Sequence, residues 1–263
     1  MRPVIALLTD FGTVDHYAGT MKGVMLGICP DATLVDISHD IPPHDVTAGA
    51  LELAAAYKYF PAGTIFVVVI DPGVGSTRRG LAVDTGDYRF VAPDNGVLTL
   101  VLRESPAKKM VELTERRYAR PTVSRTFEGR DRFAPAAAWL AKGTQLPALG
   151  RPVGEIQKLD LPSPETSGAA VQGMVVRVDR FGNLVTNIDR KTVERLAAGG
   201  AVTIDAAGTR IERLVATYAE LPADGVGALF GSTDHLELAA PSDSAARRLS
   251  LTRGAAVTVS RRA

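Results

Sequence analysis

The chain has 263 residues, of which 46% are hydrophobic and 22% charged, so it has enough apolar material for one or two globular domains. A net charge of +1 gives no global field that would attract nucleic acid or an acidic membrane. The single cysteine, Cys29, excludes a disulfide scaffold, and the four histidines lack metal-binding spacing. We find neither a signal peptide nor a long apolar run, so we expect a cytoplasmic protein.

The N-terminal part of the chain alternates between strand and helix patterns. In chain order the predicted elements are a strand at 4–8, a helix at 17–28, a strand at 33–37, a helix at 46–57 and a strand at 64–70. Pro30 stops the first helix, and Asp45 is the expected N-cap of the second. This alternation predicts an α/β domain over residues 1–160 with a largely parallel central sheet.

The pattern changes after a stretch rich in proline and serine at 161–168, which we interpret as a linker. Short apolar runs bounded by turns follow, interrupted by one predicted helix at 191–198. The predicted strands lie at 171–178, 184–188, 201–204 and 256–259. Residues 169–263 are therefore expected to form a smaller antiparallel β-domain.

Three aspartates follow predicted buried strands: Asp10 in TDFG, Asp71 in DPGVG and Asp94 in APDNG. Ligands of open α/β sheets bind outside the carboxyl ends of the strands, so this edge is the expected site. Aspartate before glycine is also ordinary turn chemistry, which is the alternative for each residue. A second alternative is a metal-dependent hydrolase that uses the three carboxylates as Mg²⁺ ligands.

Two charged segments accompany these carboxylates. The GVGSTRRG stretch lacks the lysine of a phosphate loop, and its Arg78 either is solvated or folds back over the end of the strand that precedes Asp71. FEGRDRFAP places Glu128, Arg130 and Asp131 just before a helix start at Pro135. These three residues are either loop charges or part of a charged, partly buried pocket.

A third segment, DRFGNLVTNI, suggests recognition of a flat ring. Phe181 can stack on such a ring while Asn183 reads its edge, because an amide offers both a donor and an acceptor. The alternative is a plain hairpin turn. Tyr218 is a second candidate platform, although a lone tyrosine is more often part of the core.

Taken in order, these motifs resemble one family over essentially the whole chain. The matching motifs are TDFG, MKGV, DISHDIPPHDV, DPGVGSTRR, APDNG, GRDRFAP and FGNLVTN. The sequence is similar to the S-adenosyl-L-methionine (SAM) hydroxide adenosyltransferases, the adenosine-forming SAM hydrolases, which are related to fluorinase and chlorinase. The resemblance implies an α/β domain followed by a β-barrel-like domain. It also implies a homotrimer with sites between subunits, and no cofactor or metal.

The resemblance also assigns roles to residues of this chain. Water attacks SAM to give adenosine and methionine, and Asp71 and Arg78 are expected beside that water. Asp10 is expected to bind the ribose hydroxyls. The remaining substrate contacts are assigned to Phe181 and Tyr218 flanking adenine, Asn183 at its edge, and Asp179 and Ser232 at the methionine ammonium and carboxylate.

The chain departs from the family pattern at two positions. Glu128 stands where the family usually has the histidine of FHGRD, and Gly231 stands where relatives usually have asparagine. A carboxylate at 128 can still accept a proton, provided that Arg78 separates it from Asp71. The changed charge leaves open a non-catalytic protein that only binds SAM or adenosine.

Overall fold

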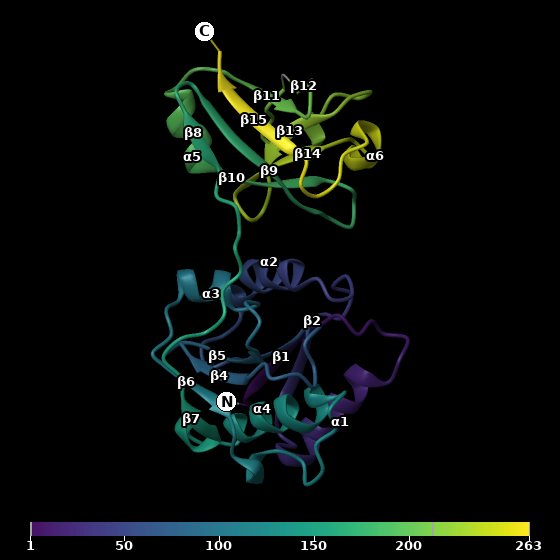
Figure 1. The fold of residues 1–263 in the computed structure, drawn as a ribbon. Coiled ribbons are helices and arrows are strands. Elements are labelled where there is room, and N and C mark those ends of the chain that lie inside the picture. Colours follow the sequence, from purple (N-terminus) through teal and green to yellow (C-terminus); the bar gives the residue numbers. More distant parts are fainter. Residues whose placement is uncertain (1, 212, 263) are drawn as a thin grey trace. The chain divides into compact units, whose positions relative to one another are not determined.

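A computed structural model describes residues 2–211 and 213–262 (Figure 1). The chain divides into two compact units, an N-terminal unit of residues 1–159 and a C-terminal unit of residues 160–263. In the N-terminal unit the strands are β1 (Val4–Thr9), β2 (Thr33–Ser38), β3 (Ile65–Val69), β4 (Gly80–Asp84), β5 (Arg89–Pro93), β6 (Lys109–Leu113) and β7 (Gly150–Pro152). Its α-helices are α1 (Tyr17–Ile28), α2 (Val46–Ala56), α3 (Thr99–Glu104) and α4 (Ala134–Ala141).

The strands of the N-terminal unit form one mixed sheet in the order β2-β1-β3-β5-β4-β6-β7. β1 is parallel to β2 and β3, and β3 is parallel to β5. β4 is antiparallel to β5 and β6, and β6 is antiparallel to β7. The predicted α/β domain with a largely parallel sheet is confirmed. Asp45 also caps α2 as predicted, because its carboxylate accepts the backbone N–H of Ala48 at 2.9 Å.

Helices cover both faces of this sheet, which is why its central strands are apolar on both sides. Figure 1 shows α2 and α3 on one face and α1 and α4 on the other. Alternate side chains of β3 enter two separate cores: Phe66 and Val68 pack with Leu53 of α2, and Val67 packs with Met21 of α1. Every residue of β3 is buried.

A π-helical turn, Gly129–Phe133, leads directly into α4. Pro135 lies at the start of α4, as its missing N–H favours. The sequence did not indicate the π turn. Such turns are rare and occur frequently at functional sites. This π turn contains Arg130 and Asp131 of the FEGRD motif.

The C-terminal unit is an antiparallel, nearly closed, barrel-like sheet, as predicted. Its strands are β8 (Glu165–Ser167), β9 (Ala170–Val178), β10 (Leu184–Asp189), β11 (Val202–Ala206), β12 (Thr209–Ile211), β13 (Gly227–Phe230), β14 (His235–Ala239) and β15 (Ala256–Arg261). The helices are α5 (Arg190–Ala197) and α6 (Ala245–Leu249). The sheet order is β12-β11-β15-β9-β10-β14-β13, and β8 pairs with β9. β8 falls within the stretch expected to be a linker.

The apolar core of this unit lies inside the curved sheet, where Val171, Leu184, Leu236 and Val257 are fully buried. Each comes from a different strand, so side chains from all around the sheet meet in one core. Among the described residues, no helix is long and apolar enough to cross a membrane.

Candidate active site

Asp10, Asp71 and Asp94 lie at one edge of the N-terminal sheet, as expected from their positions after strands. They follow β1, β3 and β5, which are parallel neighbours in this order. Asn95 helps to shape this edge, because its side-chain amide donates to the carbonyl of Ile70 at 2.8 Å, directly before Asp71.

Arg78 folds back over the end of β3 and lies between two carboxylates. Its Nε donates to Oδ1 of Asp71 at 2.9 Å, and its Nη2 donates to Oδ2 of the same residue. The same Nη2 lies 2.6 Å from Oε2 of Glu128. All three side chains are nearly buried, with exposed fractions of 9% for Arg78, 6% for Asp71 and 11% for Glu128. We call these three residues the acidic clamp.

The acidic clamp keeps its arginine charged. Burial acts to lower the pKa of Arg78, but the hydrogen bond and charge of Asp71, followed by those of Glu128, outweigh it and raise the pKa. The guanidinium also lies 5.3 Å from the ring centroid of Phe133, a favourable cation–π position. The cluster therefore has one fixed positive charge between two buried acidic groups.

Oε2 of Glu128 is buried and lies 2.6 Å from Nη2 of Arg78, the same nitrogen that donates to Asp71. Such a charged contact is what a buried carboxylate requires. Oε1 of Glu128 lies 3.7 Å from Nε of Arg132, one turn further along the chain. Glu128 is therefore oriented by arginines on two sides and keeps an oxygen that can accept a proton or hydrogen bond.

Asp131 braces the segment that carries Glu128. It is fully buried and accepts two hydrogen bonds of 2.7 Å from Arg130 and one of 2.8 Å from the backbone of Ser124. Burial acts to raise the pKa of Asp131, but the hydrogen bonds from Arg130 and Ser124 outweigh it and lower the pKa. Asp131 is thus a structural carboxylate rather than a pocket-lining one.

The DISHDIPPHDV motif holds the TDFG motif in place. His39 contacts the hydroxyl of Thr9 through Nδ1 at 2.8 Å, and its carbonyl accepts the N–H of Gly12 at 2.7 Å. The backbone N–H of His44 donates to Oδ2 of Asp10 at 2.9 Å. His44 itself has a positive φ of 67°, an uncommon conformation for a residue other than glycine. Asp10 is therefore oriented by a strained loop.

Three aromatic rings that the sequence did not single out lie between these motifs. Phe11, Tyr17 and Phe127 have ring centroids 5.1–5.9 Å apart. Tyr17 is 39% exposed. The three rings connect the turn after Asp10 with the residue before Glu128. Asp10, the candidate for binding the ribose, and the acidic clamp are therefore linked by one apolar cluster.

Asp94 has a different role from Asp71. Its Oδ2 accepts a 2.8 Å hydrogen bond from Nε of Arg79, and its Oδ1 accepts the N–H of Gln157 at 2.8 Å. Asp94 thus ties the end of the N-terminal unit to its sheet. Among the described residues, no group of three or more potential ligands could hold a metal ion. The three aspartates are engaged by separate partners, so their geometry does not favour the metal-hydrolase alternative.

In the C-terminal unit, Asp179 organises the turn between β9 and β10. Its Oδ1 accepts the N–H groups of Phe181 and Asn183 at 2.9 and 2.8 Å, and its Oδ2 accepts Nδ2 of Asn183 at 2.9 Å. Asn183 is buried, whereas the ring of Phe181 is 78% exposed. The turn presents an aromatic ring outward on a rigid base, as ring stacking requires.

Glu237 of β14 is a further buried carboxylate that sequence reasoning missed. The hydroxyl of Tyr218 donates to its Oε2 at 2.8 Å. Burial, followed by the hydrogen bond and charge of Glu237, raises the pKa of Tyr218 well above its usual value. A Cβ atom at Gly231 would lie 1.8 Å from Oε1 of Glu237, so this carboxylate fills the space of a larger residue there. Ser232 is exposed in the turn that follows.

Family models match both units of the chain. The SAM hydroxide adenosyltransferase N-terminal domain matches residues 5–150, and the C-terminal domain of the same family matches residues 173–258. The chain belongs to the SAM hydroxide adenosyltransferase family.

Individual relatives cover nearly the whole chain. An (R)-S-adenosyl-L-methionine hydrolase of Thermus thermophilus is 37% identical over 97% of this chain and 98% of its own. A fluorinase of an Actinoplanes species is 31% identical over 98% of each chain. A crystal structure of an uncharacterized conserved protein from Thermotoga maritima superposes with a TM-score of 0.93 at 33% identity, over 98% of this chain and 100% of that one.

Proposed function

We propose that this protein hydrolyses SAM to adenosine and L-methionine. Oxygen of water forms a bond to the 5′-carbon of the ribose while the bond from that carbon to sulfur breaks. The electron pair of the broken bond stays on sulfur, so methionine leaves as a neutral thioether, and the water loses one proton. A neutral leaving group needs neither a general acid nor a metal to stabilise it.

The acidic clamp is the observation that carries this proposal. The reaction needs one water held in line with the breaking bond and a group that takes its proton. Asp71 and Glu128 supply carboxylate oxygens, and Arg78 supplies a positive charge that offsets their mutual repulsion. Both oxygens of Asp71 are hydrogen-bonded to Arg78, whereas Glu128 contacts Arg78 through Oε2, so we assign the proton-accepting role to Glu128.

The substrate contacts follow from the edge of the sheet and from the aromatic turn. Oδ2 of Asp10 is held by the backbone of His44, and the carboxylate has further lone pairs for the two ribose hydroxyls. Phe181 and Tyr218 flank the adenine, and Asn183 contacts its edge. Asp179 and Ser232 bind the amino-acid end of SAM. Asp179 already accepts three hydrogen bonds within its turn, so the ammonium would take a remaining lone pair.

Hydrolysis is favoured over halogenation by the charge of the clamp. A halide ion would have to lose its hydration and approach two carboxylates, which is unfavourable in a buried site. Water carries no charge and can hydrogen-bond to both acids. The fluorinase relatives therefore share the fold, while the hydrolase relatives share the chemistry that we assign here.

The assay that tests this function is incubation of the purified chain with SAM, followed by chromatography for adenosine and methionine. We expect equimolar release of both, with no change on adding EDTA and no 5′-halogenated nucleoside in chloride or fluoride. Intact SAM after long incubation would instead support the non-catalytic alternative that Glu128 leaves open. Loss of activity in EDTA would return the metal-hydrolase alternative to consideration.

A further inference from the structure

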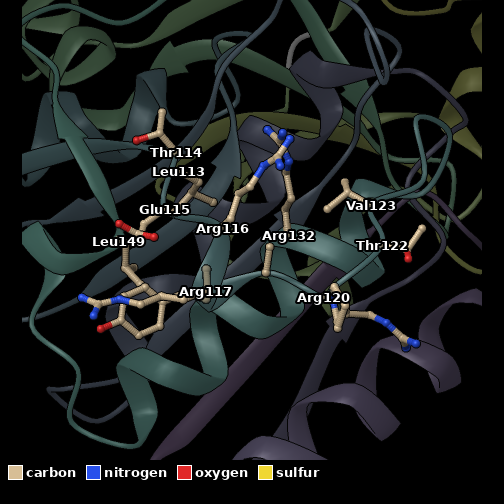
Figure 2. Close-up of a pocket in the computed structure, with 14 residues that line it drawn as sticks. Leu113, Thr114, Glu115, Arg116, Arg117, Arg120, Thr122, Val123, Arg132 and Leu149 are labelled. Carbon is tan, nitrogen blue, oxygen red and sulfur yellow. The ribbon is translucent and has the colours of Figure 1, made fainter.

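A pocket in the N-terminal unit is lined by none of the three residues of the acidic clamp. It has a volume of about 540 Å³ and is lined by the segment from the end of β6 to residue 123 and by the start of α4 (Figure 2). Four arginines line it: Arg116, Arg117, Arg120 and Arg132. We call it the arginine pocket. Its size is within the usual range for small-molecule sites, roughly 300–1,000 Å³.

The four arginines are unequally neutralised. Arg120 lies 3.5 Å from Asp131, and Arg117 is stacked 4.7 Å from the ring centroid of Tyr118. Within the described part of the chain, the acidic partner of Arg132 is Glu128, at a long 3.7 Å, and the side chain of Arg132 is 39% exposed. Among the described residues, Arg116 has no ion pair or hydrogen bond of its side chain.

The two least neutralised arginines extend in the same direction. In Figure 2, the side chains of Arg116 and Arg132 point the same way, while Arg117 extends to another side. The carboxylate of Glu115, which also lines the pocket, lies well away from both guanidinium groups in this view. Arg132 keeps its long contact to Glu128, and Arg116 has no ion pair among the described residues, so the pocket has positive charge that a bound anion can neutralise.

We propose that the arginine pocket binds a phosphate-bearing small molecule, with Arg116 and Arg132 holding the phosphate. A guanidinium offers paired N–H donors that match two phosphate oxygens, and two such groups balance a dianion. Leu113, Val123 and Leu149 line the same pocket and can cover a less polar part of the ligand. SAM is a cation at sulfur and carries no phosphate, so this ligand is distinct from the proposed substrate.

The charge of the whole chain favours a small ligand over nucleic acid. The net charge is +1, so the chain as a whole has no strong positive field that would attract a polyanion. Nucleic-acid binding by backbone contacts would need several phosphates to be neutralised along an extended surface.

Titration calorimetry with pyrophosphate as the probe, at constant ionic strength, tests the proposal on the full chain. We expect saturable binding to the wild type and a loss of about tenfold or more in affinity for Arg116→Ala, on the scale of a charge-assisted hydrogen bond. Arg116→Lys should bind with intermediate affinity, because it keeps the charge without the paired donors. Arg103→Ala is the matched control, since Arg103 is an exposed arginine of α3 in the same unit.

The control should bind pyrophosphate as the wild type does, and thermal unfolding should show that all variants are folded. Equal affinity of the wild type and Arg116→Ala would overturn the proposal, as would an equal loss in Arg103→Ala. A short RNA that binds more tightly than pyrophosphate and also depends on Arg116 would replace the small ligand with nucleic acid. None of these measurements depends on SAM hydrolysis, so the two proposals fail separately.

Discussion

Glu128 stands where the family resemblance leads us to expect a histidine, and the structure gives this difference a physical setting. A second carboxylate beside Asp71 would repel it, but Arg78 lies between the two and contacts both. Phe133 covers the guanidinium on another side. The guanidinium of Arg78 therefore supplies the positive charge that a second carboxylate at position 128 requires.

Glu128→Gln should lower the rate of adenosine release by about tenfold or more, because an amide cannot take the proton from water. Glu128→His restores the residue that the family pattern has at this position and should keep or raise the rate. Steady-state adenosine release from about pH 6 to 9 measures both, with SAM binding as the control for folding. If Glu128→Gln is as active as the wild type and Glu128→His brings no gain, the position is structural.

Asp71→Asn should reduce turnover by roughly a hundredfold while largely preserving SAM binding, because size is kept and the charge that orients water is lost. Asp71 is preferable to Arg78 for this test. Removal of Arg78 leaves two buried acidic groups unpaired, a change that costs about 3–5 kcal/mol of stability. Calorimetry measures the binding of SAM, and single-turnover chromatography measures the rate of its conversion, so together they separate binding from turnover. Wild-type turnover in Asp71→Asn would place the water elsewhere.

At the scale of elements, the turn between β9 and β10 is a rigid mount for one aromatic ring. Its carboxylate, Asp179, satisfies the backbone of the turn, and Gly182 has a φ of +85°. A Cβ atom at Gly182 would lie 2.2 Å from Oγ of Ser244, so glycine is required by close packing as well as by conformation.

Phe181→Ala should weaken adenosine binding by several-fold, because stacking contributes about 0.5–1.5 kcal/mol beyond buried area. Phe181→Tyr keeps the ring and should have a milder effect. The ring is 78% exposed, so neither change should lower the unfolding temperature much. Calorimetric titration with adenosine checks this, and unchanged affinity in the alanine variant would remove Phe181 from the site.

The π turn before α4 carries the pH dependence that the structure predicts most directly. The pKa of Asp131 is lower in the folded chain than the unfolded value of about 3.9. Its stabilising effect is therefore complete above that value and is lost as the pH falls through the lower, folded pKa. The free energy of unfolding in urea should change less between pH 6 and pH 3 in Asp131→Asn than in the wild type. An equal change in both proteins would contradict the stabilising role of Asp131.

Sequence reasoning correctly predicted that two of the candidate residues lie at neighbouring strand ends. Asp10 and Asp71 follow apolar runs, and the chain direction of parallel strands brings such ends to one edge. It could not assign partners across the fold, because these depend on three-dimensional packing. Asp94 shows this limit, since it follows a strand as Asp71 does, yet it binds Arg79 and Gln157 rather than facing the clamp.

Other residues were missed because their local pattern is ordinary. Glu237 lies in a strand and gives no turn or motif signal, although it is buried and bonded to Tyr218. Phe11, Tyr17 and Phe127 are typical core residues by type, and only their contacts identify them as one apolar cluster. The π turn has no reliable sequence signature.

At the scale of the whole molecule, the candidate residues are divided between the two compact units. The acidic clamp and Asp10 belong to the N-terminal unit, while Phe181, Asn183 and Tyr218 belong to the C-terminal unit. A homotrimer with sites between subunits, which the family resemblance implies, would bring complementary halves together from different chains. Because subunits in a closed ring meet head to tail, every interface would then contain one site.

Mixing two variants tests this assembly. Asp71→Asn damages only the N-terminal half of a site and Phe181→Ala only the C-terminal half. In a randomly mixed trimer with shared sites, about a quarter of the interfaces combine two intact halves. Co-expressed variants should therefore release adenosine at limiting SAM faster than the mean of the two variants measured separately. Light scattering should give three times the 27.8 kDa of one chain. Sites formed within one chain would show no such recovery, and an active species of 27.8 kDa would rule the shared site out.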